Sequence, residues 1–353
     1  MTASYRYPLD GFGQKLQRAD INLPPVTGEQ VLLRVTHAGV CHSDVHIQDG
    51  YQDLGNGARM EFADSSMPLP LVMGHEIVGE VIAVGPLGDA SLVGKSRLVY
   101  PWIGCGACTA CGAGRENHCE HAHTLGIFRD GGYAQHVLVP ASRYLLDIEG
   151  LDPAWACTLA CSGLTVYSAL EQLLPIAKGG ALAVMGAGGL GLAAVGLARA
   201  FGMERIIACD LDPQRLAAAR RLGADEVLDC GVTGAAAHLI QLANGQLCAV
   251  LDTVGAPSTL RLAMDSLVKG SRIVLLGLQG GSIDLALPLL PFKALAIIGS
   301  YTGSLTQLHA LIGLAREGRL PSIPIEQRPL CGVDDALDEL RSGRVVGRIV
   351  LNP

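Results

Sequence analysis

The feature that most constrains the fold is a glycine-rich turn between an apolar segment and a helical pattern in the second half of the chain. Residues 181–185 are apolar throughout, as in a strand that is buried on both faces. The sequence Gly186-Ala-Gly-Gly-Leu-Gly191 follows at once, and a helical pattern then continues to about Phe201. Because a strand, a G-x-G-x-x-G turn and a helix stand in this order, the segment predicts a dinucleotide-binding unit.

The residues after this turn repeat the alternation of strand and helix. The expected strands are short and apolar, and helical segments separate them. We predict strands at residues 205–209, 226–228, 248–251 and 271–276, a helix that begins at residue 213, and further helices at 235–243 and 258–268. This alternation is typical of an α/β fold with a doubly wound parallel sheet and helices on both faces.

The glycines and one acidic residue have separate expected roles in this unit. Gly186 makes the turn, Gly188 lets the backbone approach a pyrophosphate, and Gly191 allows the helix to pack closely on the strand. Asp210, at the end of the second strand, can accept hydrogen bonds from both adenosine ribose hydroxyls, and its charge would repel a 2′-phosphate. NAD is therefore favoured over NADP. Arg215 is a nearby cation that could bind a 2′-phosphate, so it leaves this preference open.

A second constraint is a cluster of polar side chains that follows a strand-like segment near the N-terminus. The sequence Gly39-Val-Cys-His-Ser-Asp-Val-His46 carries one thiol, two imidazoles, a hydroxyl and a carboxylate. His75 and Glu76 precede another apolar run, and Cys161 lies much later in the sequence Ala-Cys-Ser-Gly. Cys41, His75 and Cys161 would together form a three-ligand zinc site with one open position, as a catalytic zinc requires.

Each of these residues also has a plain structural interpretation. Cys41 and Cys161 could be small buried hydrophobic residues, and His75 could be a satisfied core histidine. The spacing alone does not choose between Cys161 and Cys157 as the third ligand. We favour metal binding because further polar residues stand directly beside these candidates, which isolated core residues would not need.

Four more cysteines stand within fifteen residues, interleaved with glycine and alanine. They are Cys105, Cys108, Cys111 and Cys119. Four thiolates at this spacing suit a closed tetrahedral zinc site, and a closed site leaves no position for water, so its role is structural. Three neighbouring histidines could compete as ligands, and we expect them to be solvated loop residues: His118, His121 and His123.

Composition excludes several other classes of protein. The 353 residues are 49% hydrophobic and 17% charged, with a net charge of −7, which argues against a nucleic-acid or anionic-membrane partner. No apolar run approaches the ~20 residues that span a bilayer. The first ten residues lack the pattern of a signal peptide. Eleven cysteines without an export signal favour thiols and metal over disulfides, and the expected location is the cytoplasm.

The pattern of segments predicts two domains. Residues 1–150 read as β-rich, with a polar surface excursion at 50–70, and the last fifty residues return to a mixed pattern with helices near 306–317 and 333–342 and a strand at 348–351. We expect this tail to return to the first domain. The predicted division is a catalytic domain of residues 1–154 and 302–353 with both zinc sites, and a dinucleotide-binding domain of residues 155–301.

Taken together, these motifs resemble the zinc-dependent medium-chain alcohol dehydrogenase family, especially its bacterial and archaeal members, over essentially the whole chain. The resemblance rests on both cysteine motifs, the glycine fingerprint, the sequence Cys161-Ser-Gly-Leu-Thr-Val-Tyr167 and the sequence Val346-Gly-Arg348. It implies a GroES-like catalytic domain with a Rossmann domain inserted. It also implies that Cys161 is the third ligand of the catalytic zinc, with Glu76 as an occasional fourth.

The resemblance also implies roles for further residues. Ser43 and His46 would form a proton relay, and Asp44 would orient His75. The remaining assignments are His42 and Arg348 near the pyrophosphate, Gly189 in the coenzyme-binding turn, Thr165 and Leu190 against the nicotinamide, and Trp102, Leu278 and Tyr301 in the substrate pocket. Because this pocket is apolar or aromatic, the resemblance implies NAD-linked oxidation of a hydrophobic or aromatic primary or secondary alcohol to an aldehyde or ketone.

Other classes of protein remain as alternatives. The first is a polyol or sugar-alcohol dehydrogenase of the same fold, and the second is a non-catalytic nucleotide-binding protein. A zinc-ribbon module for nucleic acid, based on the four cysteines alone, conflicts with the acidic net charge. A homo-oligomer is expected, a tetramer by resemblance with a dimer as the alternative, and alternating apolar residues at 283–290 could add a strand across its two-fold axis.

Overall fold

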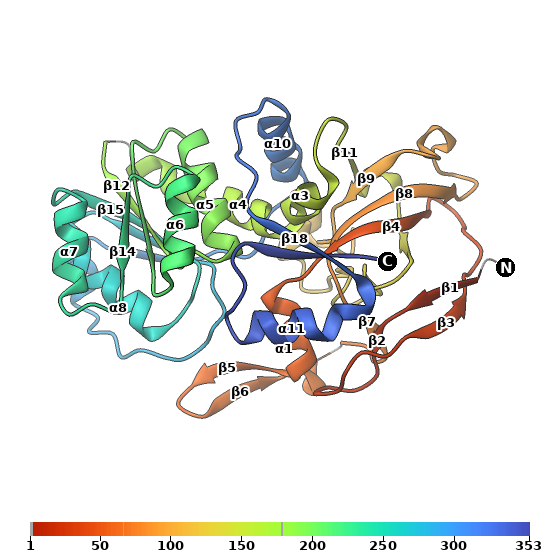
Figure 1. Ribbon diagram of the computed structural model, residues 1–353, viewed down its shortest axis with the longest axis horizontal. Coiled ribbons are helices and arrows are strands. Elements are labelled where there is room, and N and C mark those ends of the chain that lie inside the picture. Colours follow the sequence, from red (N-terminus) through yellow and green to blue (C-terminus); the bar gives the residue numbers. More distant parts are fainter. Residues whose placement is uncertain (1–2, 66, 178) are drawn as a thin grey trace.

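The computed structural model describes residues 3–65, 67–177 and 179–353 as two side-by-side lobes (Figure 1). One lobe contains a parallel sheet between helices, and the other is rich in antiparallel strands. The chain begins in the β-rich lobe, passes through the helical lobe and ends in the β-rich lobe again (Figure 1). Among the described residues, no helix is both long and apolar enough to cross a bilayer.

The helical lobe is built on a six-stranded sheet with the order β14-β13-β12-β15-β16-β17, in which all neighbours are parallel. Its strands are β12 (Ala181–Met185), β13 (Arg205–Asp210), β14 (Glu226–Asp229), β15 (Leu247–Asp252), β16 (Arg272–Leu275) and β17 (Ala296–Gly299). Because β13 and β15 flank β12 on opposite sides, the strand order reverses beside β12. In such sheets, ligands bind outside the carboxyl ends of the strands at this point.

Helices cover both faces of this sheet. They are α4 (Leu164–Ala177), α5 (Gly189–Ala200), α6 (Pro213–Arg221), α7 (Ala235–Leu242), α8 (Pro257–Ser266) and α9 (Leu289–Lys293). Alternate residues of β12 enter two different cores: Leu182 and Val184 belong to one cluster, and Ala183 and Met185 belong to the other. This two-sided burial explains why the strand is continuously apolar.

The β-rich lobe contains a seven-stranded sheet in which β4 is central. Its strands are β4 (Val31–Gly39), β8 (Glu76–Val84), β9 (Ser96–Val99), β10 (His136–Val139), β11 (Leu145–Asp147), β18 (Ile325–Pro329) and β19 (Arg348–Asn352). The antiparallel pairing of β4 with β8 sets Gly39 opposite Glu76. β19 also pairs with β4, with Val350 opposite Gly39. These pairings bring β8 and β19, which are distant from β4 in the sequence, to the carboxyl end of β4.

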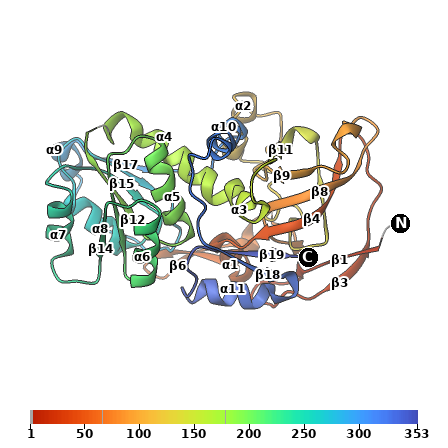
Figure 2. The same cartoon turned by 45° about the horizontal axis from the view of Figure 1, so that its top comes forward.

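The other helices of this lobe are short and flank the sheet. Figure 2 shows α2 (Thr109–Gly112) and α10 (Leu305–Arg316) on one side, and α1 (His42–Asp49) and α11 (Val333–Arg341) on the other. The helix α3 (Pro153–Thr158) packs on β4 and β8, and it continues through the π-helical turn η5 (Leu159–Gly163) into α4. The remaining elements are β1 (Ala3–Arg6), β2 (Pro8–Leu9), β3 (Ala19–Asn22), β7 (Leu71–Val72), and the 3-10 turns η1 (Phe62–Asp64), η2 (Ala90–Leu92), η3 (Glu116–His118), η4 (Ser142–Tyr144) and η6 (Leu330–Gly332).

The polar excursion expected at residues 50–70 contains a β-hairpin, formed by β5 (Tyr51–Gly55) and β6 (Ala58–Glu61). Asn56 and Gly57 turn the chain with φ angles of 53° and 79°, as a tight hairpin turn requires. The hairpin is not a free surface loop. Gln52 donates a hydrogen bond of 2.6 Å to the Leu278 carbonyl, and a Cβ on Gly55 would lie 2.5 Å from the Ser282 amide nitrogen. β5 therefore contacts the other lobe.

Two segments differ from the expected strand pattern. Residues 133–139 lie in the region expected to be β-rich, but they pair regularly only from His136, because the Tyr133 amide donates to the Met73 carbonyl outside the main sheet. The segment 283–286 has no regular secondary structure, and α9 begins at Leu289. β17 is therefore the edge strand of the parallel sheet in the single chain.

Candidate metal centres and coenzyme site

The three predicted ligands of the first metal centre come together. Cys41 lies two residues after the end of β4 as the N-cap of α1, His75 directly precedes β8, and Cys161 lies in the π-helical turn η5. One sulfur or imidazole atom from each lies within 4.8 Å of the other two, and all three residues are buried. The register of β4 and β8 therefore produces the Cys41–His75 pair, and the packing of η5 on β8 adds Cys161.

The chemistry of these three residues fits a zinc ion. Among the described residues, neither ring nitrogen of His75 has a hydrogen-bond partner, although the side chain is fully buried. The hydrogen bond between Cys161 and Cys41 lowers the pKa of Cys41 well below its usual range and raises the pKa of Cys161. A thiolate is therefore favoured at Cys41, and two sulfurs with one imidazole are donors that zinc prefers.

A buried carboxylate links the two segments that carry Cys41 and His75. Asp44 Oδ2 accepts hydrogen bonds from the Cys41 amide at 2.9 Å and from the Tyr133 hydroxyl at 2.8 Å. Asp44 Oδ1 accepts from the Gly74 amide at 3.3 Å and lies 3.6 Å from His75 Nδ1. Asp44 thus lies beside His75. A role for Tyr133 could not be predicted from the sequence, because its partner is 89 residues away.

Glu76 and Arg348 form a buried ion pair beside this centre. Burial raises the pKa of Glu76 to about 7, and its Oε1 also lies 3.4 Å from the Ser162 amide. Glu76 is outside the group of three converging ligand atoms. A Cβ on Gly189 would lie 2.3 Å from Arg348 Cδ, so the Arg348 side chain packs directly against the glycine-rich turn.

The four predicted ligands of the second centre also converge within 4.8 Å: Cys105, Cys108, Cys111 and Cys119. The Cys108 sulfur lies 3.5 Å from that of Cys111 and 3.7 Å from that of Cys119. Backbone amides donate to two of the sulfurs, from Cys105 to Cys119 at 3.3 Å and from Ala107 to Cys105 at 3.5 Å. Such amide donors stabilise thiolates. Those beside Cys105 help to lower the pKa of its thiol to about 6. The histidines considered as competing ligands are not in this group.

The expected relay residues lie on the first turns of α1. Ser43 Oγ is 3.7 Å from the Cys41 sulfur, which places the hydroxyl at the edge of the first metal centre. His46 follows one helical turn later and is half-buried, and this burial lowers its pKa. His42, at the first position of α1, is exposed.

Of the three expected pocket residues, Trp102 lies beside the first metal centre and Tyr301 lies against Trp102. The Trp102 ring is 5.3 Å from the His75 ring, and its indole nitrogen donates to the Ala160 carbonyl at 2.9 Å. The Tyr301 ring contacts Trp102 edge-on at 5.9 Å. Leu278 is 53% exposed, and its carbonyl accepts a hydrogen bond from Gln52 of the hairpin.

The glycine-rich turn has the geometry that a pyrophosphate needs. Gly186 has a φ of 86°, and a Cβ on Gly191 would lie 1.8 Å from the Gly186 carbonyl oxygen, so α5 starts too close to β12 for any side chain. A Cβ on Gly188, in contrast, would meet no atom within 4 Å. The N-terminus of α5 therefore faces open space in which an anion can bind. Thr165 is buried in the first turn of α4, and Leu190 is half-buried in the first turn of α5.

Asp210 and Arg215 differ in how their side chains are engaged. Asp210 lies at the carboxyl end of β13 and accepts from the Ala187 amide at 2.6 Å, which fixes it beside the turn. The Arg215 guanidinium donates to the carbonyls of Gly343 and Val345, at 2.5 Å and 3.1 Å. Because these carbonyls precede β19, Arg215 connects α6 to the C-terminal segment.

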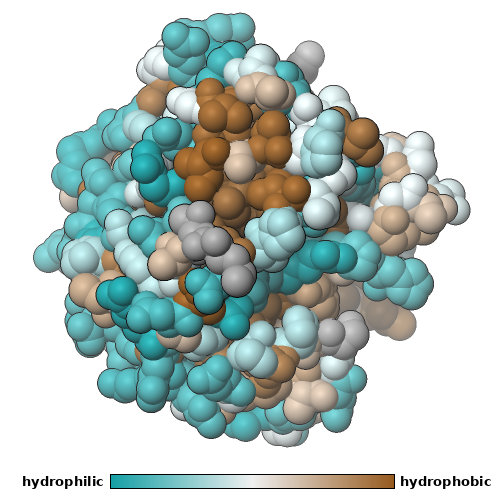
Figure 3. Space-filling view, turned by 90° about the vertical axis from the view of Figure 1, so that its right-hand side faces the viewer, coloured by the Kyte–Doolittle hydropathy of each residue, from teal (hydrophilic) through white to brown (hydrophobic). Residues whose placement is uncertain are grey.

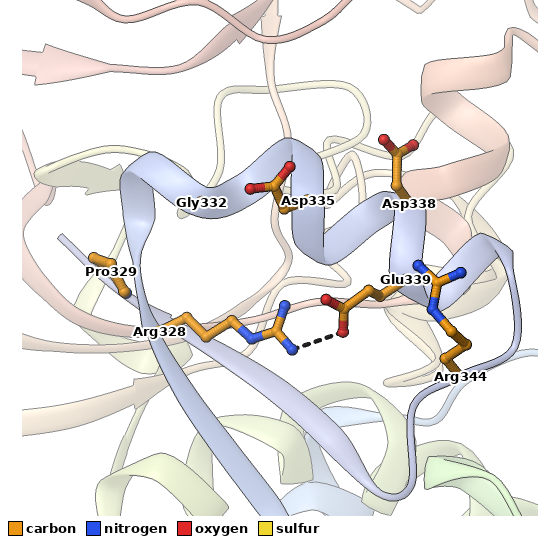
Figure 4. Close-up of a pocket in the computed structure, with 7 residues that line it drawn as sticks. All are labelled: Arg328, Pro329, Gly332, Asp335, Asp338, Glu339 and Arg344. Carbon is orange, nitrogen blue, oxygen red and sulfur yellow. Dashed lines mark hydrogen bonds and ion pairs between the residues drawn. The ribbon is translucent and has the colours of Figure 1, made fainter.

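A surface hollow of about 430 Å³ lies between β18 and α11 (Figure 4). It is lined by Arg328, Pro329, Gly332, Asp335, Asp338, Glu339 and Arg344. Arg328 donates to Glu339 at 2.7 Å within it, so opposite charges pair with each other. None of the candidate ligands or coenzyme residues lines this hollow, and we assign it no function.

Families of known proteins match both parts of the chain that carry the candidate sites. Residues 27–149 match the model of the alcohol dehydrogenase GroES-like domain, and residues 189–317 match that of the zinc-binding dehydrogenases. An NAD-dependent alcohol dehydrogenase of Sulfurisphaera tokodaii is 35% identical over 343 residues, 97% of each chain.

Solved structures show the same architecture over the whole chain. The alcohol dehydrogenase of Aeropyrum pernix superposes with a TM-score of 0.89 at 28% identity, covering 99% of this chain and 100% of that one. The D-arabinose dehydrogenase of Sulfolobus solfataricus gives 0.84 at 27% identity, covering 100% of both.

The chain belongs to the zinc-dependent medium-chain alcohol dehydrogenase family. It is therefore a zinc-binding, NAD-linked oxidoreductase that acts on alcohols, with a GroES-like and a Rossmann-type unit.

Proposed function

We propose that the protein oxidises hydrophobic or aromatic primary and secondary alcohols reversibly to aldehydes or ketones, at a zinc held by Cys41, His75 and Cys161. The observation that carries this proposal is the convergence of these three donor atoms within 4.8 Å in a buried site. Four-coordinate zinc with three protein ligands keeps one position for substrate. The second group of four cysteines has no such position and is proposed to hold a structural zinc.

The residues around the first centre have distinct proposed roles. When bound, zinc supplies a Lewis acid that lowers the pKa of an alcohol, and NAD accepts the hydride. Ser43, whose Oγ is 3.7 Å from the Cys41 sulfur, would accept the hydroxyl proton and release its own, and His46 would deliver a proton to solvent at the end of the relay. Asp44 holds the His75 ring, and Tyr133 holds Asp44.

Ser43→Ala tests the relay. The change should lower kcat about 10²-fold, as expected for loss of a general acid–base group, while the dissociation constant for NAD stays the same. A full rate in this variant would remove Ser43 from the mechanism. Asp49→Ala, on the same helix, is the matched control and should keep the parent rate.

The coenzyme is proposed to bind along the glycine-rich turn formed by Gly186, Gly188, Gly189, Leu190 and Gly191, with Asp210 on the adenosine ribose. Arg215 is committed to two backbone carbonyls, so we propose that it does not bind a 2′-phosphate. Asp210→Ala should therefore lower the preference for NAD over NADP about tenfold or more, measured as the ratio of the kcat/KM values. An unchanged ratio would contradict the assignment.

The alcohol is proposed to lie against Trp102 and Tyr301, because the Trp102 ring stands next to His75 and the Tyr301 ring contacts Trp102. This wall offers apolar area and few hydrogen bonds, so it favours hydrophobic substrates. The alternative is a polyol or sugar alcohol, and the D-arabinose dehydrogenase shows that this fold can hold a sugar substrate. Rates with benzyl alcohol, cyclohexanol and sorbitol decide: the proposal requires sorbitol to be the poorest substrate.

A homo-oligomer is proposed through the exposed edge of the parallel sheet. Beside β17, Leu287 and Phe292 are 72% and 74% exposed, and a second copy could cover them. Figure 3 shows another apolar area at the end of the β-rich lobe. A closed tetramer needs two interfaces, and these two areas could supply them. Phe292→Asp should reduce the mass measured by light scattering; an unchanged mass would contradict this edge as an interface.

The expected domain boundaries and cytoplasmic location stay predictions. The boundary expected after residue 154 falls inside α3, which packs on β4 and β8. We therefore propose that the first boundary lies after Gly163, so that Cys161 stays with the other ligands of its zinc. We keep residue 302 as the point at which the chain returns to the catalytic domain.

A further inference from the structure

We propose that the four-cysteine segment (residues 105–119) positions the wall of the substrate pocket, with Asn117 as the positioning residue. This inference rests on the proposed function, because it takes Trp102 and Tyr301 as that wall. It assigns the segment a second role beside stability, namely control over which alcohols the pocket accepts.

Two polar side chains join the four-cysteine segment to the rest of the protein. Most of its residues are exposed or half-exposed, but Glu116 and Asn117, in the turn η3, are 8% and 9% exposed. Polar side chains are buried at a cost unless they form hydrogen bonds. Their burial therefore marks where the segment is attached.

Both side chains lead to the same short segment, residues 301–303. Asn117 Nδ2 donates directly to the Tyr301 carbonyl at 3.0 Å. Glu116 accepts from the Tyr144 hydroxyl at 2.8 Å, and the Tyr144 ring stacks on Tyr100 at 6.2 Å.

The Tyr100 hydroxyl then donates to the Gly303 carbonyl at 2.9 Å. The carbonyls on both sides of Thr302 are thus held, one directly by the four-cysteine segment and one through two tyrosines.

The residue between these carbonyls is strained. Thr302 has a φ of 46°, which is an outlier for a β-branched residue. It is 6% exposed, and its hydroxyl has no hydrogen-bond partner in the structure. Such a conformation persists only where the surroundings impose it, and it is commonly found at functional sites. Here the surroundings that impose it are the two held carbonyls.

Tyr301 transmits this conformation to the site. Its ring contacts Trp102 at 5.9 Å, and Trp102 in turn lies 5.3 Å from His75. If the Asn117 hydrogen bond is lost, Thr302 can relax to a negative φ and the Tyr301 ring can leave Trp102. The pocket would then change shape while both groups of zinc ligands keep their contacts.

The test replaces Asn117 by Ala and by Asp, which is similar in size but lacks the N–H donor. Arg115→Ala is the matched control, because it removes an exposed side chain from the same segment. Tyr100→Phe removes the hydrogen bond at the Gly303 carbonyl and so tests the second attachment with little risk to folding.

The first readout needs no turnover. The chain has two tryptophans, Trp102 and Trp155, so in a Trp155→Phe background the fluorescence reports on Trp102 alone. Both Asn117 variants should shift the emission of Trp102 or increase its quenching by acrylamide, with two zinc ions per chain retained. The Arg115→Ala control should match the parent.

The second readout is the ratio of kcat/KM for benzyl alcohol to that for ethanol. It should change roughly three- to tenfold in both Asn117 variants and in the same direction in Tyr100→Phe, mainly through KM for benzyl alcohol. An unchanged ratio and unchanged Trp102 fluorescence would overturn the inference. Equal losses for both alcohols together with loss of zinc would also overturn it, because they indicate a purely structural role.

Tyr301→Ala separates failure of this inference from failure of the proposed function. If Tyr301→Ala changes the ratio but the Asn117 variants do not, the pocket assignment stands and the positioning role is wrong. If Tyr301→Ala also leaves the ratio unchanged, the proposed pocket itself is wrong.

Discussion

The two candidate metal centres of this protein are built in opposite ways. The four cysteines of the second centre stand within fifteen residues and lie in a segment whose surface is largely exposed. The ligands of the first centre, Cys41, His75 and Cys161, span 121 residues and are all buried. The first centre exists only when β4, β8 and η5 are correctly packed, whereas the second needs little beyond its own turns.

This difference is the reason why we propose a catalytic role for one centre and a structural role for the other. The compact centre has short turns and backbone amides that would surround a bound ion with sulfur, so no position would be free. The dispersed centre draws its ligands from a sheet and a helix, which are rigid elements. It can therefore leave one side open to substrate and still hold its ligands in place.

The largest expected effect comes from the third ligand. Cys161→Ala should lower kcat/KM at least about 10³-fold and reduce bound zinc to one ion per chain, because the dispersed centre loses one of its thiolates.

The control is Cys157→Ala, one turn earlier, which removes a buried thiol outside the ligand group. This variant should keep both zinc ions and most of the activity. If the two variants behave in the reverse way, the ligand assignment is wrong.

A ligand of the compact centre should affect stability more than chemistry. Cys105→Ala opens the four-sulfur site, and we expect the free energy of unfolding to fall by about 2–4 kcal/mol and the melting temperature to fall roughly 5–10 °C. Activity at 25 °C should remain, with altered selectivity if Asn117 acts as proposed. A melting temperature equal to that of the parent would contradict the structural role.

The carboxylate that serves the dispersed centre should have an intermediate effect. Asp44→Asn keeps the shape but weakens the contacts with His75 and the Cys41 amide, and zinc affinity should fall about 10–100-fold. Competition with a chelator at several concentrations measures this loss. The compact centre should retain its zinc throughout, and joint release of both ions would show that the centres are not independent.

The smallest effect is expected from Tyr133→Phe. The change removes one hydrogen bond to Asp44 and leaves the ring packed against Gly74. A hydrogen bond to a charged group contributes about 1.5–3 kcal/mol, part of which is felt as stability rather than catalysis. We expect kcat/KM to fall only a few-fold. A loss as large as that of Cys161→Ala would mean that Tyr133 contacts substrate directly.

The sequence predicted the compact centre and the glycine-rich turn well, because both depend on neighbours in the chain. Cys105 to Cys119 and Gly186 to Gly191 are each short enough for spacing to determine geometry. Five of the six strands of the parallel sheet were also placed to within a few residues, since two-sided burial gives a clear apolar pattern, whereas the edge strand β17 was not predicted.

Contacts between distant residues could not be predicted from spacing. The choice of Cys161 over Cys157 came from resemblance to the family, because only the packing of η5 on β8 decides it. The ion pair between Glu76 and Arg348 depends on the register of the strands that carry them. The hydrogen bond from Asn117 to the Tyr301 carbonyl depends on the φ angle of Thr302. The hairpin of β5 and β6 was not predicted, because its residues are polar and the Leu278 carbonyl that Gln52 contacts lies in the other lobe.

Anomalous X-ray scattering at the zinc edge, from crystals of the protein, tests the central claim most directly. We expect two peaks per chain, one within bonding distance of Cys41, His75 and Cys161 and one surrounded by the four cysteines of residues 105–119. A peak at the four cysteines alone, from protein that is active with alcohol and NAD, would contradict it.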